Sequence, residues 1–258
     1  MNDTLLEHLG KLFSLSGQRA VVTGASRGIG KALAIGLAKS GADLVITARN
    51  TESLASTADA IKAIGRNVDS IACDQRDVEA IRNALGAIGP IDILVNNAGV
   101  EDVCPAKDIE EALWDKILDT NLKGAFFTSQ AVAKSMAEKK RGSIINLASL
   151  TSFVGVPTAV PYGSSKSGIS GMTRALATEW ASDGIRVNAI APGYFRTEMT
   201  EGFYQNEEWA EGMQSKIPLG RFGQLDDLIG AVLFLASPAS NYVTGQILGI
   251  DGGYLAAI

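Results

Sequence analysis

Histidine and cysteine are almost missing from this sequence of 258 residues, which contains one of the first and two of the second. With His8 as the only imidazole, Ser-His-Asp hydrolysis, Cys-His proteolysis and histidine-rich zinc sites lack their usual parts, and we predict no metal site. Cys73 and Cys104 form no disulfide framework, so we interpret both as reduced thiols of a cytoplasmic protein. We place His8 in a loose N-terminal segment, as an ordinary surface residue.

Excess positive charge and long apolar runs are missing as well. The net charge of -5 argues against a general nucleic-acid surface and against attraction to anionic membranes. No apolar stretch is long enough to span a bilayer, and the start MNDTLLEHLG lacks both a basic beginning and a signal-peptide core. We therefore expect a cytoplasmic protein with neither a nucleic-acid nor a membrane partner.

Short β-branched runs alternate with longer amphipathic ones along most of the chain. We predict strands at 20–23, 44–48, 70–73, 93–96, 143–148, 187–190 and 247–250. Most of these runs are apolar throughout, which is typical of parallel strands buried on both faces. Helices are predicted between them at 31–40, 51–64, 110–139, 162–182 and 225–237. The alternation predicts one α/β domain over 1–258, a Rossmann-like doubly wound parallel sheet of about seven strands with helices on both faces.

Residues 194–217 break this alternation. Aromatic side chains, among them Tyr194, Tyr204 and Trp209, stand there among polar residues. This composition is expected of a lid over a pocket, and we predict a substrate lid within the single domain.

The stretch TGASRGIG, Thr23 to Gly30, lies where the first predicted strand meets the first predicted helix. Ligands of doubly wound sheets bind at the carboxyl ends of strands, where glycines let the backbone approach a pyrophosphate and a helix N-terminus offers free N–H groups. The spacing differs from the common G-x-G-x-x-G, so a tight strand-helix turn is the alternative. We predict that a dinucleotide contacts Gly24, Ser26, Arg27, Gly28, Ile29 and Gly30.

The end of the second predicted strand indicates which dinucleotide. An NAD site normally places an acid there to bind the ribose 2′-hydroxyl, but this chain has Ala48, Arg49 and Asn50. Arg49 and Arg27 can clamp a 2′-phosphate, or both can be solvated surface charges. The missing acid favours NADP(H) over NAD(H).

Further motifs follow in order along the chain. They are Asn96-Asn97-Ala98-Gly99, Ser149, Tyr162-Gly163-Ser164-Ser165-Lys166, Pro192-Gly193 and Thr197. Together with the glycine loop, this set resembles the classical short-chain dehydrogenase/reductases over residues 15–254. Each motif alone is weak, and their joint occurrence is specific. The resemblance implies hydride transfer between a nicotinamide and a ketone or secondary alcohol, and a homotetramer.

Tyr162 and Lys166 are four residues apart and share a helix face. Lowering the pKa of a phenol from ~10 to about 7 requires roughly 4 kcal/mol. A lysine ammonium about 5 Å away supplies roughly 3 kcal/mol at an effective dielectric of about 20, and an oxidised nicotinamide can add the rest. Tyr162 is then the general acid/base. Ser149 would donate a hydrogen bond to the substrate oxygen, and the resemblance implies that Asn121 links Lys166 to a proton relay.

The resemblance also implies contacts with the cofactor. It places Asp74 at the adenine amino group, with a simple turn residue as the alternative, and the stretch Asn97, Ala98 and Gly99 beneath the adenosine ribose. Asn97 can instead bond only within the sheet. The remaining implied contacts lie toward the nicotinamide and the phosphates: Tyr162, Lys166, Pro192, Gly193 and Thr197.

The substrate is less defined. The chain is similar to gluconate 5-dehydrogenases and to 3-oxoacyl-carrier-protein reductases, whose substrates are anionic. Glu101 and Asp102 follow the fourth strand, in a loop that flanks the substrate pocket in this family, and together they would repel an anion. The alternative is that they point into solvent, which we expect of at least one of them. We expect a neutral ketone, a sugar or a polyol, with those two activities as alternatives.

Two readings from other classes remain open. A dinucleotide-sensing protein without catalysis would tolerate loss of Tyr162 or Lys166, and this chain keeps both, together with Ser149. An epimerase or dehydratase of the related extended type usually needs a longer C-terminal substrate domain.

Overall fold

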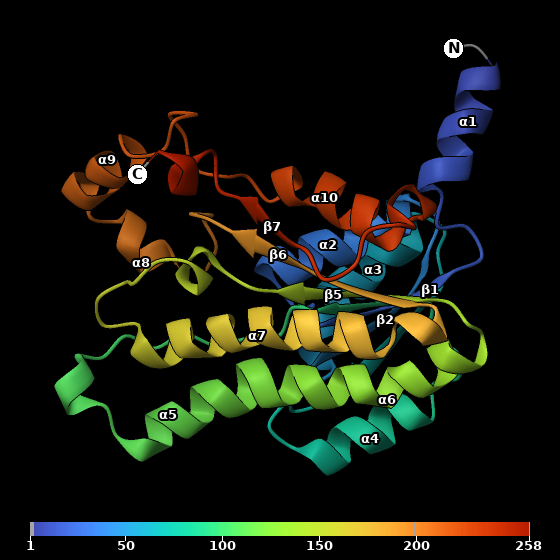
Figure 1. Ribbon diagram of the computed structural model, residues 1–258, viewed down its shortest axis with the longest axis horizontal. Coiled ribbons are helices and arrows are strands. Elements are labelled where there is room, and N and C mark those ends of the chain that lie inside the picture. Colours follow the sequence, from blue (N-terminus) through green and yellow to red (C-terminus); the bar gives the residue numbers. More distant parts are fainter. Residues whose placement is uncertain (1–2, 199, 258) are drawn as a thin grey trace.

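The computed structural model describes residues 3–198 and 200–257, apart from the side chain of Phe203 (Figure 1). Met199 and the Phe203 side chain fall within the predicted lid and lie outside the described residues. The strands are β1 Arg19–Thr23, β2 Asp43–Ala48, β3 Val68–Ala72, β4 Ile93–Asn96, β5 Gly142–Leu147, β6 Ile185–Pro192 and β7 Ile247–Ile250. They match the seven predicted strands to within two residues at each end.

Helices connect consecutive strands. The α-helices are α1 Asp3–Phe13, α2 Gly28–Lys39, α3 Ala55–Ala63, α4 Val78–Gly86, α5 Glu111–Leu118, α6 Gly124–Glu138, α7 Val160–Glu179, α8 Glu201–Tyr204, α9 Glu207–Gln214 and α10 Asp226–Ala236. The short helices are η1 Glu52–Leu54, η2 Ala106–Asp108, η3 Asp119–Lys123, η4 Leu150–Ser152, η5 Ala181–Asp183, η6 Pro238–Ser240 and η7 Tyr254–Ala256. No helix in the described ranges has the length and apolar character needed to cross a membrane.

The seven strands form one parallel sheet in the order β3-β2-β1-β4-β5-β6-β7. The predicted doubly wound, Rossmann-like sheet is confirmed. The chain runs outward from β1 to β3, returns to the middle, and runs outward again from β4 to β7. The direction of winding therefore reverses between β1 and β4, and in sheets of this type ligands bind outside the carboxyl ends of the strands at such a point.

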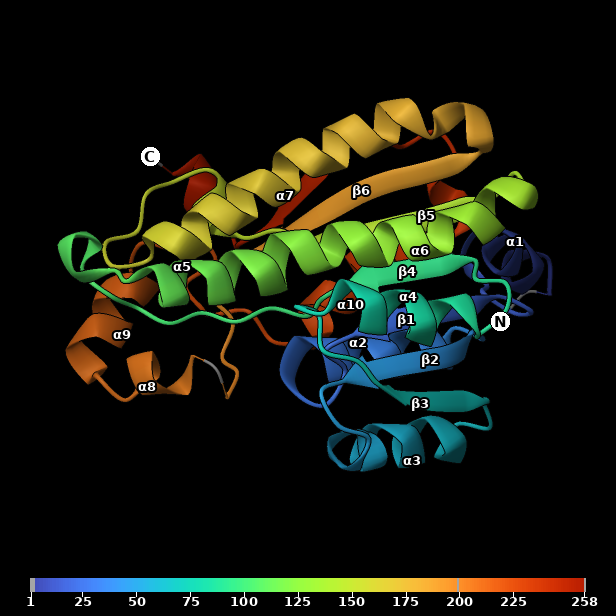
Figure 2. The same ribbon diagram turned by 90° about the horizontal axis from the view of Figure 1, so that it is seen from below.

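The two faces of the sheet are buried under separate helix layers. Side chains alternate across a strand, so Ala20 and Val22 of β1 pack with α2, α3 and α10, whereas Val21 packs with α4, α6 and α7. Figure 2 shows these helices on opposite sides of the sheet. Burial of both faces explains why the strands are apolar throughout, since each buried aliphatic side chain contributes roughly 1.5–3 kcal/mol.

The N-terminal segment is not loose as predicted, because residues 3–13 form helix α1. An ion pair of 2.8 Å joins Glu7 and Lys11 one turn apart, and Asp3 lies in the first turn, where a negative charge complements the helix dipole. None of the residues of α1 is buried. Figure 1 shows α1 projecting at the end of the molecule opposite α8 and α9.

Helices α8 and α9 lie in the segment predicted as a lid, beyond the carboxyl ends of the strands (Figures 1 and 2). The segment begins where β6 ends at Pro192, and Phe195 pairs with Gly223 in an isolated β-bridge. The ring of Phe195 is buried, and a side chain at Gly223 would collide with it. This contact anchors the start of the segment to the sheet.

Candidate active site

The glycine loop lies directly against the end of β4. Gly24 has a φ of +63°, and a Cβ atom there would stand 2.8 Å from the Cα atom of Ala98. At Gly30, in the first turn of α2, a Cβ atom would collide with the Gly24 carbonyl oxygen. Both positions therefore require glycine, because the two backbones and the helix approach each other too closely for any side chain.

Thr23 and Asn97 fasten this loop from within. The Oγ1 atom of Thr23 accepts hydrogen bonds of 3.0 Å from the N–H groups of Asn97 and Ala98. The Nδ2 group of Asn97 donates to the carbonyls of Thr23 and Gly24, at 2.9 and 3.0 Å. The side chain of Asn97 thus bonds to the loop and the sheet, the alternative kept open above. No motif predicted that Thr23 accepts these hydrogen bonds; the signal for it in the sequence is a hydroxyl residue directly before the first glycine.

The other loop residues line the same edge. Ser26 and Ile29 are half-buried, and Gly28 has a φ of +52° and faces Thr197, whose Cβ atom lies 3.8 Å from a Cβ built at Gly28. Arg27 is exposed and forms an ion pair of 2.9 Å with Glu198. The glycine loop and the start of the lid segment are therefore in contact through Arg27.

The ends of β2 and β3 present opposite charges. Arg49 follows β2 and is exposed, and its charge acts on Asp74, which follows β3. The carboxylate of Asp74 accepts hydrogen bonds from the Arg76 guanidinium, at 2.7 Å for the shortest, and these hold the pKa of Asp74 below its usual range. Asp74 is thus part of an ion pair, and Arg49 is the exposed cation at the end of β2.

Ser149, Tyr162 and Lys166 converge from two elements. Ser149 follows β5 and caps η4, where its Oγ accepts from the N–H group of Thr151 at 3.2 Å. Tyr162 and Lys166 lie one turn apart on α7, with the Lys166 ammonium 5.6 Å from the centre of the Tyr162 ring. A hydrogen bond joins the side chains of Ser149 and Tyr162. Lys166 is buried, and its Nζ donates to the carbonyl of Leu147 at 2.6 Å.

Asn121 lies in η3, a π-helical turn that divides the predicted helix 110–139 into α5 and α6. Its side chain is buried and donates to Ser165 Oγ at 3.1 Å and to the Val100 carbonyl at 2.9 Å, and its Oδ1 accepts from the N–H group of Val100 at 2.8 Å. Single π turns of this kind often occur at functional sites. Asn121 connects the loop after β4 with helix α7.

Burial dominates the electrostatics around Tyr162. Burial and the charge of Glu101 raise the pKa of Tyr162, and the hydrogen bond with Ser149 opposes this shift. Burial lowers the pKa of Lys166 to about 8, against the opposite effect of Glu101. The predicted lowering of the Tyr162 pKa is therefore not produced by the contacts of the chain. Within these contacts Tyr162 holds its proton at neutral pH and can donate it.

The two acids after β4, at least one of which was expected to point into solvent, have different surroundings. Asp102 is exposed and forms an ion pair of 2.5 Å with Lys116 of α5. Glu101 is half-buried, and its pKa is raised by burial, with Lys166 opposing and Asp102 adding to the shift. The charge of Glu101 therefore acts inside the site, whereas that of Asp102 is compensated at the surface.

Aromatic rings pack around the lid segment. The ring of Tyr194 packs edge-to-face against Trp209 and Tyr254, with centroid separations of 5.9 and 5.4 Å. Tyr204 packs in the same way against Trp209 and Phe222. Burial raises the pKa of Tyr194, and Tyr254, Tyr204 and Glu101 add to that shift. The C-terminal residues thus pack against the lid segment.

Pro192 and Gly193 stand at the end of β6, close to the C-terminal turn. The N–H group of Gly193 donates to the carbonyl of Ile250 at 2.9 Å, and a Cβ atom at Gly193 would lie 2.7 Å from that of Asp251. Gly99 lies beside Lys166 of α7: a Cβ atom at Gly99 would stand 3.7 Å from Lys166 Nζ. The residues predicted to contact cofactor thus gather along the carboxyl edge of the sheet.

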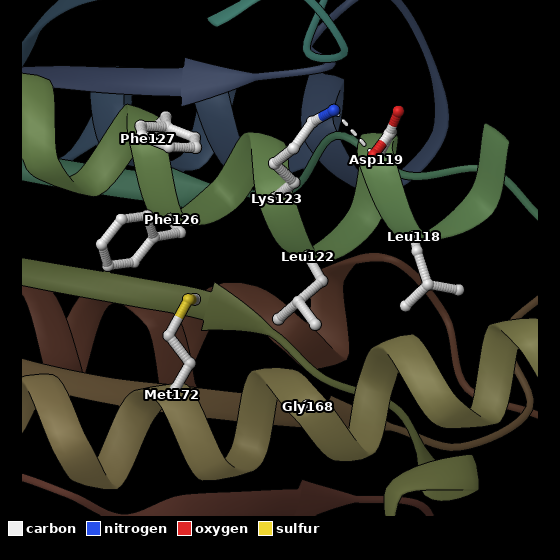
Figure 3. Close-up of a pocket in the computed structure, with 8 residues that line it drawn as sticks. All are labelled: Leu118, Asp119, Leu122, Lys123, Phe126, Phe127, Gly168 and Met172. Carbon is white, nitrogen blue, oxygen red and sulfur yellow. Dashed lines mark ion pairs between the residues drawn. The ribbon is translucent and has the colours of Figure 1, made fainter. Parts of the chain in front are cut away.

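A separate hollow of about 440 Å³ lies outside this edge, between the helices that carry Asn121 and Tyr162. Figure 3 shows Leu122, Phe126 and Met172 pointing into it, beside the ion pair of Lys123 with Asp119. Its walls are apolar, and none of the predicted site residues lines it. Across the described residues, no group of three or more His, Cys, Asp or Glu side chains is arranged to hold a metal ion.

Known proteins are similar to this chain in both sequence and fold. The family model described as enoyl-(acyl carrier protein) reductase matches residues 24–255. A gluconate 5-dehydrogenase of Gluconobacter oxydans is 43% identical over 251 residues, which are 96% of this chain and 98% of that protein. A putative short-chain alcohol dehydrogenase from Sinorhizobium meliloti is 58% identical with a TM-score of 0.92, covering 95% of this chain and 99% of that one. A gluconate 5-dehydrogenase from Burkholderia cenocepacia, solved with NADP and tartrate, is 39% identical with a TM-score of 0.94, covering 97% and 100%.

Proposed function

The chain belongs to the short-chain dehydrogenase/reductase family, and from this premise we propose that it is an NADP(H)-dependent oxidoreductase that interconverts a ketone and a secondary alcohol. One observation carries the proposal: Ser149, Tyr162 and Lys166 meet at the carboxyl edge of the sheet, beside a glycine cradle that admits no side chain. Bound NADPH would supply the hydride that reduces the carbonyl carbon.

In the proposed reaction Tyr162 is the general acid. Its raised pKa keeps the proton on the phenol at neutral pH, ready for the oxygen of a ketone as that oxygen gains charge. Ser149 would donate a second hydrogen bond to the same oxygen. Lys166 would stabilise the phenolate that remains after transfer, since its ammonium lies 5.6 Å from the ring centre. Asn121 would hold the loop after β4 against α7. It would also form part of the path by which a replacement proton reaches Lys166.

We infer that the glycine loop holds the pyrophosphate, since Gly24 and Gly30 carry no side chain that would keep the phosphates away from the backbone N–H groups. Arg49 would bind the 2′-phosphate. Arg27 would bind it as well, with its guanidinium divided between the phosphate and Glu198. The absence of an acid at the end of β2 supports this, as does the NADP in the Burkholderia cenocepacia structure. Asp74 would meet adenine with the lone pairs that Arg76 leaves free.

The remaining proposed contacts with the cofactor come from the loop after β4, from α7 and from the segment after β6, along the same edge of the sheet. The stretch of Asn97, Ala98 and Gly99 would pass under the adenosine ribose, and Lys166 and Tyr162 would face the nicotinamide ribose. Pro192, Gly193 and Thr197 would line the carboxamide and phosphate side. The contact between Gly28 and Thr197 supports a cofactor that is enclosed from both sides.

We propose a sugar or polyol as the substrate, with residues 194–217 as its lid. The half-buried Glu101 supports a neutral compound, and the aromatic cluster of Tyr194, Tyr204 and Trp209 supports an apolar wall. The second candidate is a sugar acid, which is favoured by the gluconate 5-dehydrogenase names of two relatives. Reduction of a 3-oxoacyl group on a carrier protein is a third, and overall acidity disfavours an acidic carrier.

The experiment is a reduction screen that follows NADPH absorbance with ketoses, keto-sugar acids, 2-keto acids, acyl thioesters and aryl ketones. The proposal expects turnover of at least one ketone, faster with NADPH than with NADH at equal concentration. The matching alcohols, offered with NADP+, test the reverse direction. Tight NADPH binding without turnover of any compound would favour the dinucleotide-sensing alternative, and absence of NADPH binding would contradict the proposal altogether.

We further propose a homotetramer that works in the cytoplasm. The apolar hollow between α6 and α7 is open at the surface and lined by Leu118, Leu122, Phe126 and Met172, which suits helix packing against a second copy (Figure 3). The two free thiols, Cys73 and Cys104, support a reducing compartment. Light scattering after gel filtration should give about 108 kDa, four times the 27.0 kDa of one chain, and a mass of one chain would contradict the tetramer.

A further inference from the structure

The loop after β4 is fastened at both ends to the elements that carry the proposed catalytic residues. On one side the backbone of Val100 exchanges two hydrogen bonds with Asn121, of 2.8 and 2.9 Å. On the other side the N–H group of Cys104 donates to the carbonyl of Thr158, at 2.9 Å, just ahead of α7. Glu101 follows Val100 directly, so its position is set by the same bonds that hold Asn121.

The environment of Glu101 is that of the site. Gly99, two residues earlier, lies so close to Lys166 that a Cβ atom there would be 3.7 Å from its Nζ. The carboxylate of Glu101 interacts electrostatically with Lys166, Tyr162 and Tyr194. Tyr162 and Lys166 belong to α7, and Tyr194 stands at the start of the lid segment, so the charge of Glu101 acts on both elements.

The neighbouring acid provides a built-in contrast. Asp102 is turned to Lys116 on α5, at 2.5 Å, and its side chain is half exposed. Glu101 is the more buried of the two and forms no salt bridge with a described residue. Burying even part of a carboxylate that lacks a close cationic partner has a cost, and that cost is reduced when its oxygen atoms accept hydrogen bonds. A ligand that carries a donor would meet that need.

We propose that Glu101 is the specificity-determining residue of the site: its carboxylate accepts a hydrogen bond from a hydroxyl group on the carbon next to the reacting carbon, and it excludes substrates that carry a carboxylate there. The inference rests on the proposed function. An ionised carboxylate only accepts hydrogen bonds, so it matches a hydroxyl and repels a second carboxylate. Ketoses and polyols fit this rule, as do sugar acids whose carboxylate is remote from the reacting carbon. Substrates of the 2-keto acid type do not.

The test uses three small ketones that differ only in the group beside the carbonyl: hydroxyacetone, butanone and pyruvate. Each competes with the best ketone of the reduction screen, and its inhibition constant is measured, or its KM where it is itself reduced. The full-length protein with NADPH should bind hydroxyacetone at least tenfold more tightly than butanone, and butanone more tightly than pyruvate. Sites built to hydrogen-bond a hydroxyl discriminate in this way against analogues that lack it.

Two variants assign the effect. Glu101→Gln keeps the shape and removes the charge, and it should reduce the preference for hydroxyacetone over butanone about tenfold and tighten pyruvate binding by a similar factor. Asp102→Asn, the matched control, should leave both ratios within twofold of the original protein, because Lys116 already compensates that charge. NADPH binding should stay unchanged in both.

Failure of the inference can be told from failure of the proposed function. Turnover of a ketone with ratios that Glu101→Gln leaves unchanged, or that Asp102→Asn changes equally, overturns the role of Glu101 alone. A best substrate without a hydroxyl beside its carbonyl does the same. If no ketone or alcohol is turned over, the proposed function falls, and the inference falls with it.

Discussion

Two regions meet at the carboxyl edge of the sheet, and they are held by different forces. The glycine loop is fixed by short backbone bonds through Thr23 and Asn97, and by contacts at Gly24 and Gly30 that leave no room for a side chain. The lid segment 194–217 is held by edge-to-face ring contacts and by exposed ion pairs, such as that between Arg196 and Glu201. From this difference we expect a rigid platform below a segment that moves at lower cost.

The energies support that division. A buried hydrogen-bonded backbone group costs ~1–3 kcal/mol to leave unpaired, whereas an exposed ion pair contributes about 0–1 kcal/mol. The ion pair of Arg27 with Glu198 is of the second kind, and together with the contact between Gly28 and Thr197 it connects the lid segment to the loop. Changes on the platform should therefore have large effects, and changes on the lid small ones.

The largest effect is expected from Tyr162→Phe. Removing the hydroxyl removes the general acid, so kcat should fall about 10³-fold, within the range of proton-transfer catalysis. NADPH affinity and the thermal midpoint should stay close to those of the original protein, because the ring still fills its place. Initial rates by NADPH absorbance, with binding by fluorescence, measure both. Tyr242→Phe, at a fully exposed tyrosine, is the control. Turnover that survives Tyr162→Phe contradicts the assigned role.

The next effect tests the rigidity of the platform. In Gly30→Ala, the new methyl group would collide with the Gly24 carbonyl and the Asn97 amide, so the free energy of unfolding should fall by about 3 kcal/mol and NADPH binding should weaken. Urea unfolding measures the loss. Gly86→Ala, at the end of α4 with no atom within 4 Å, should be neutral or slightly stabilising. Equal free energies of unfolding of the two variants would contradict the predicted rigidity, because the glycine loop would then have moved to accommodate the methyl group.

A smaller effect separates the two coenzymes. Arg49→Asp should weaken NADPH about 30-fold, because a cation is replaced by an anion beside the 2′-phosphate, and should change NADH less than threefold. Fluorescence titration of both coenzymes gives the ratio. Lys62→Asp, the same change of charge on the exposed side of α3, controls for the overall field. If both coenzymes lose affinity equally, Arg49 does not bind the phosphate.

The smallest effect is expected on the lid. Glu198→Gln removes the carboxylate that holds Arg27, which should tighten NADPH binding by up to about threefold and shift the thermal midpoint by less than about 2 °C. Added salt should reduce the difference, since both side chains are exposed. Glu208→Gln on α9 is the control. Weaker NADPH binding in Glu198→Gln would mean that the ion pair orders the loop for the cofactor.

Local pattern predicted most of the fold. The seven strands and most of the helices between them follow from apolar runs and helical spacing, because a parallel strand buried on both faces is apolar along its length. Helices α4, α8 and α9 had no predicted counterpart. Helix α1 was missed: none of its residues is buried, and Leu5, Leu6 and Leu9 are exposed, so it adds nothing to the core that the alternation of strands and helices describes. The π turn at Asn121 was not predicted: residues 110–139 were expected to form one long helix or two, and a polar residue capping a kink was the alternative role of Asn121.

The candidate site divides in the same way. The order of motifs indicated Ser149, Tyr162 and Lys166, and these side chains converge in the structure. The predicted lowering of the Tyr162 pKa includes a bound nicotinamide and stays a prediction. Within the chain alone burial raises this pKa, and burial is a property of the whole fold. The pairing of Arg27 with Glu198 joins residues 171 positions apart, which no local pattern could indicate.

The sequence by itself determined the parallel sheet, the glycine loop and the spacing of Tyr162 and Lys166, because each depends on the periodicity or backbone freedom of nearby residues. Only the tertiary structure decided that Asp102 turns to Lys116 while the charge of Glu101 acts on Lys166 and Tyr162. Two adjacent carboxylates are alike in a sequence, and their charge acquires a role only from the elements packed around each one.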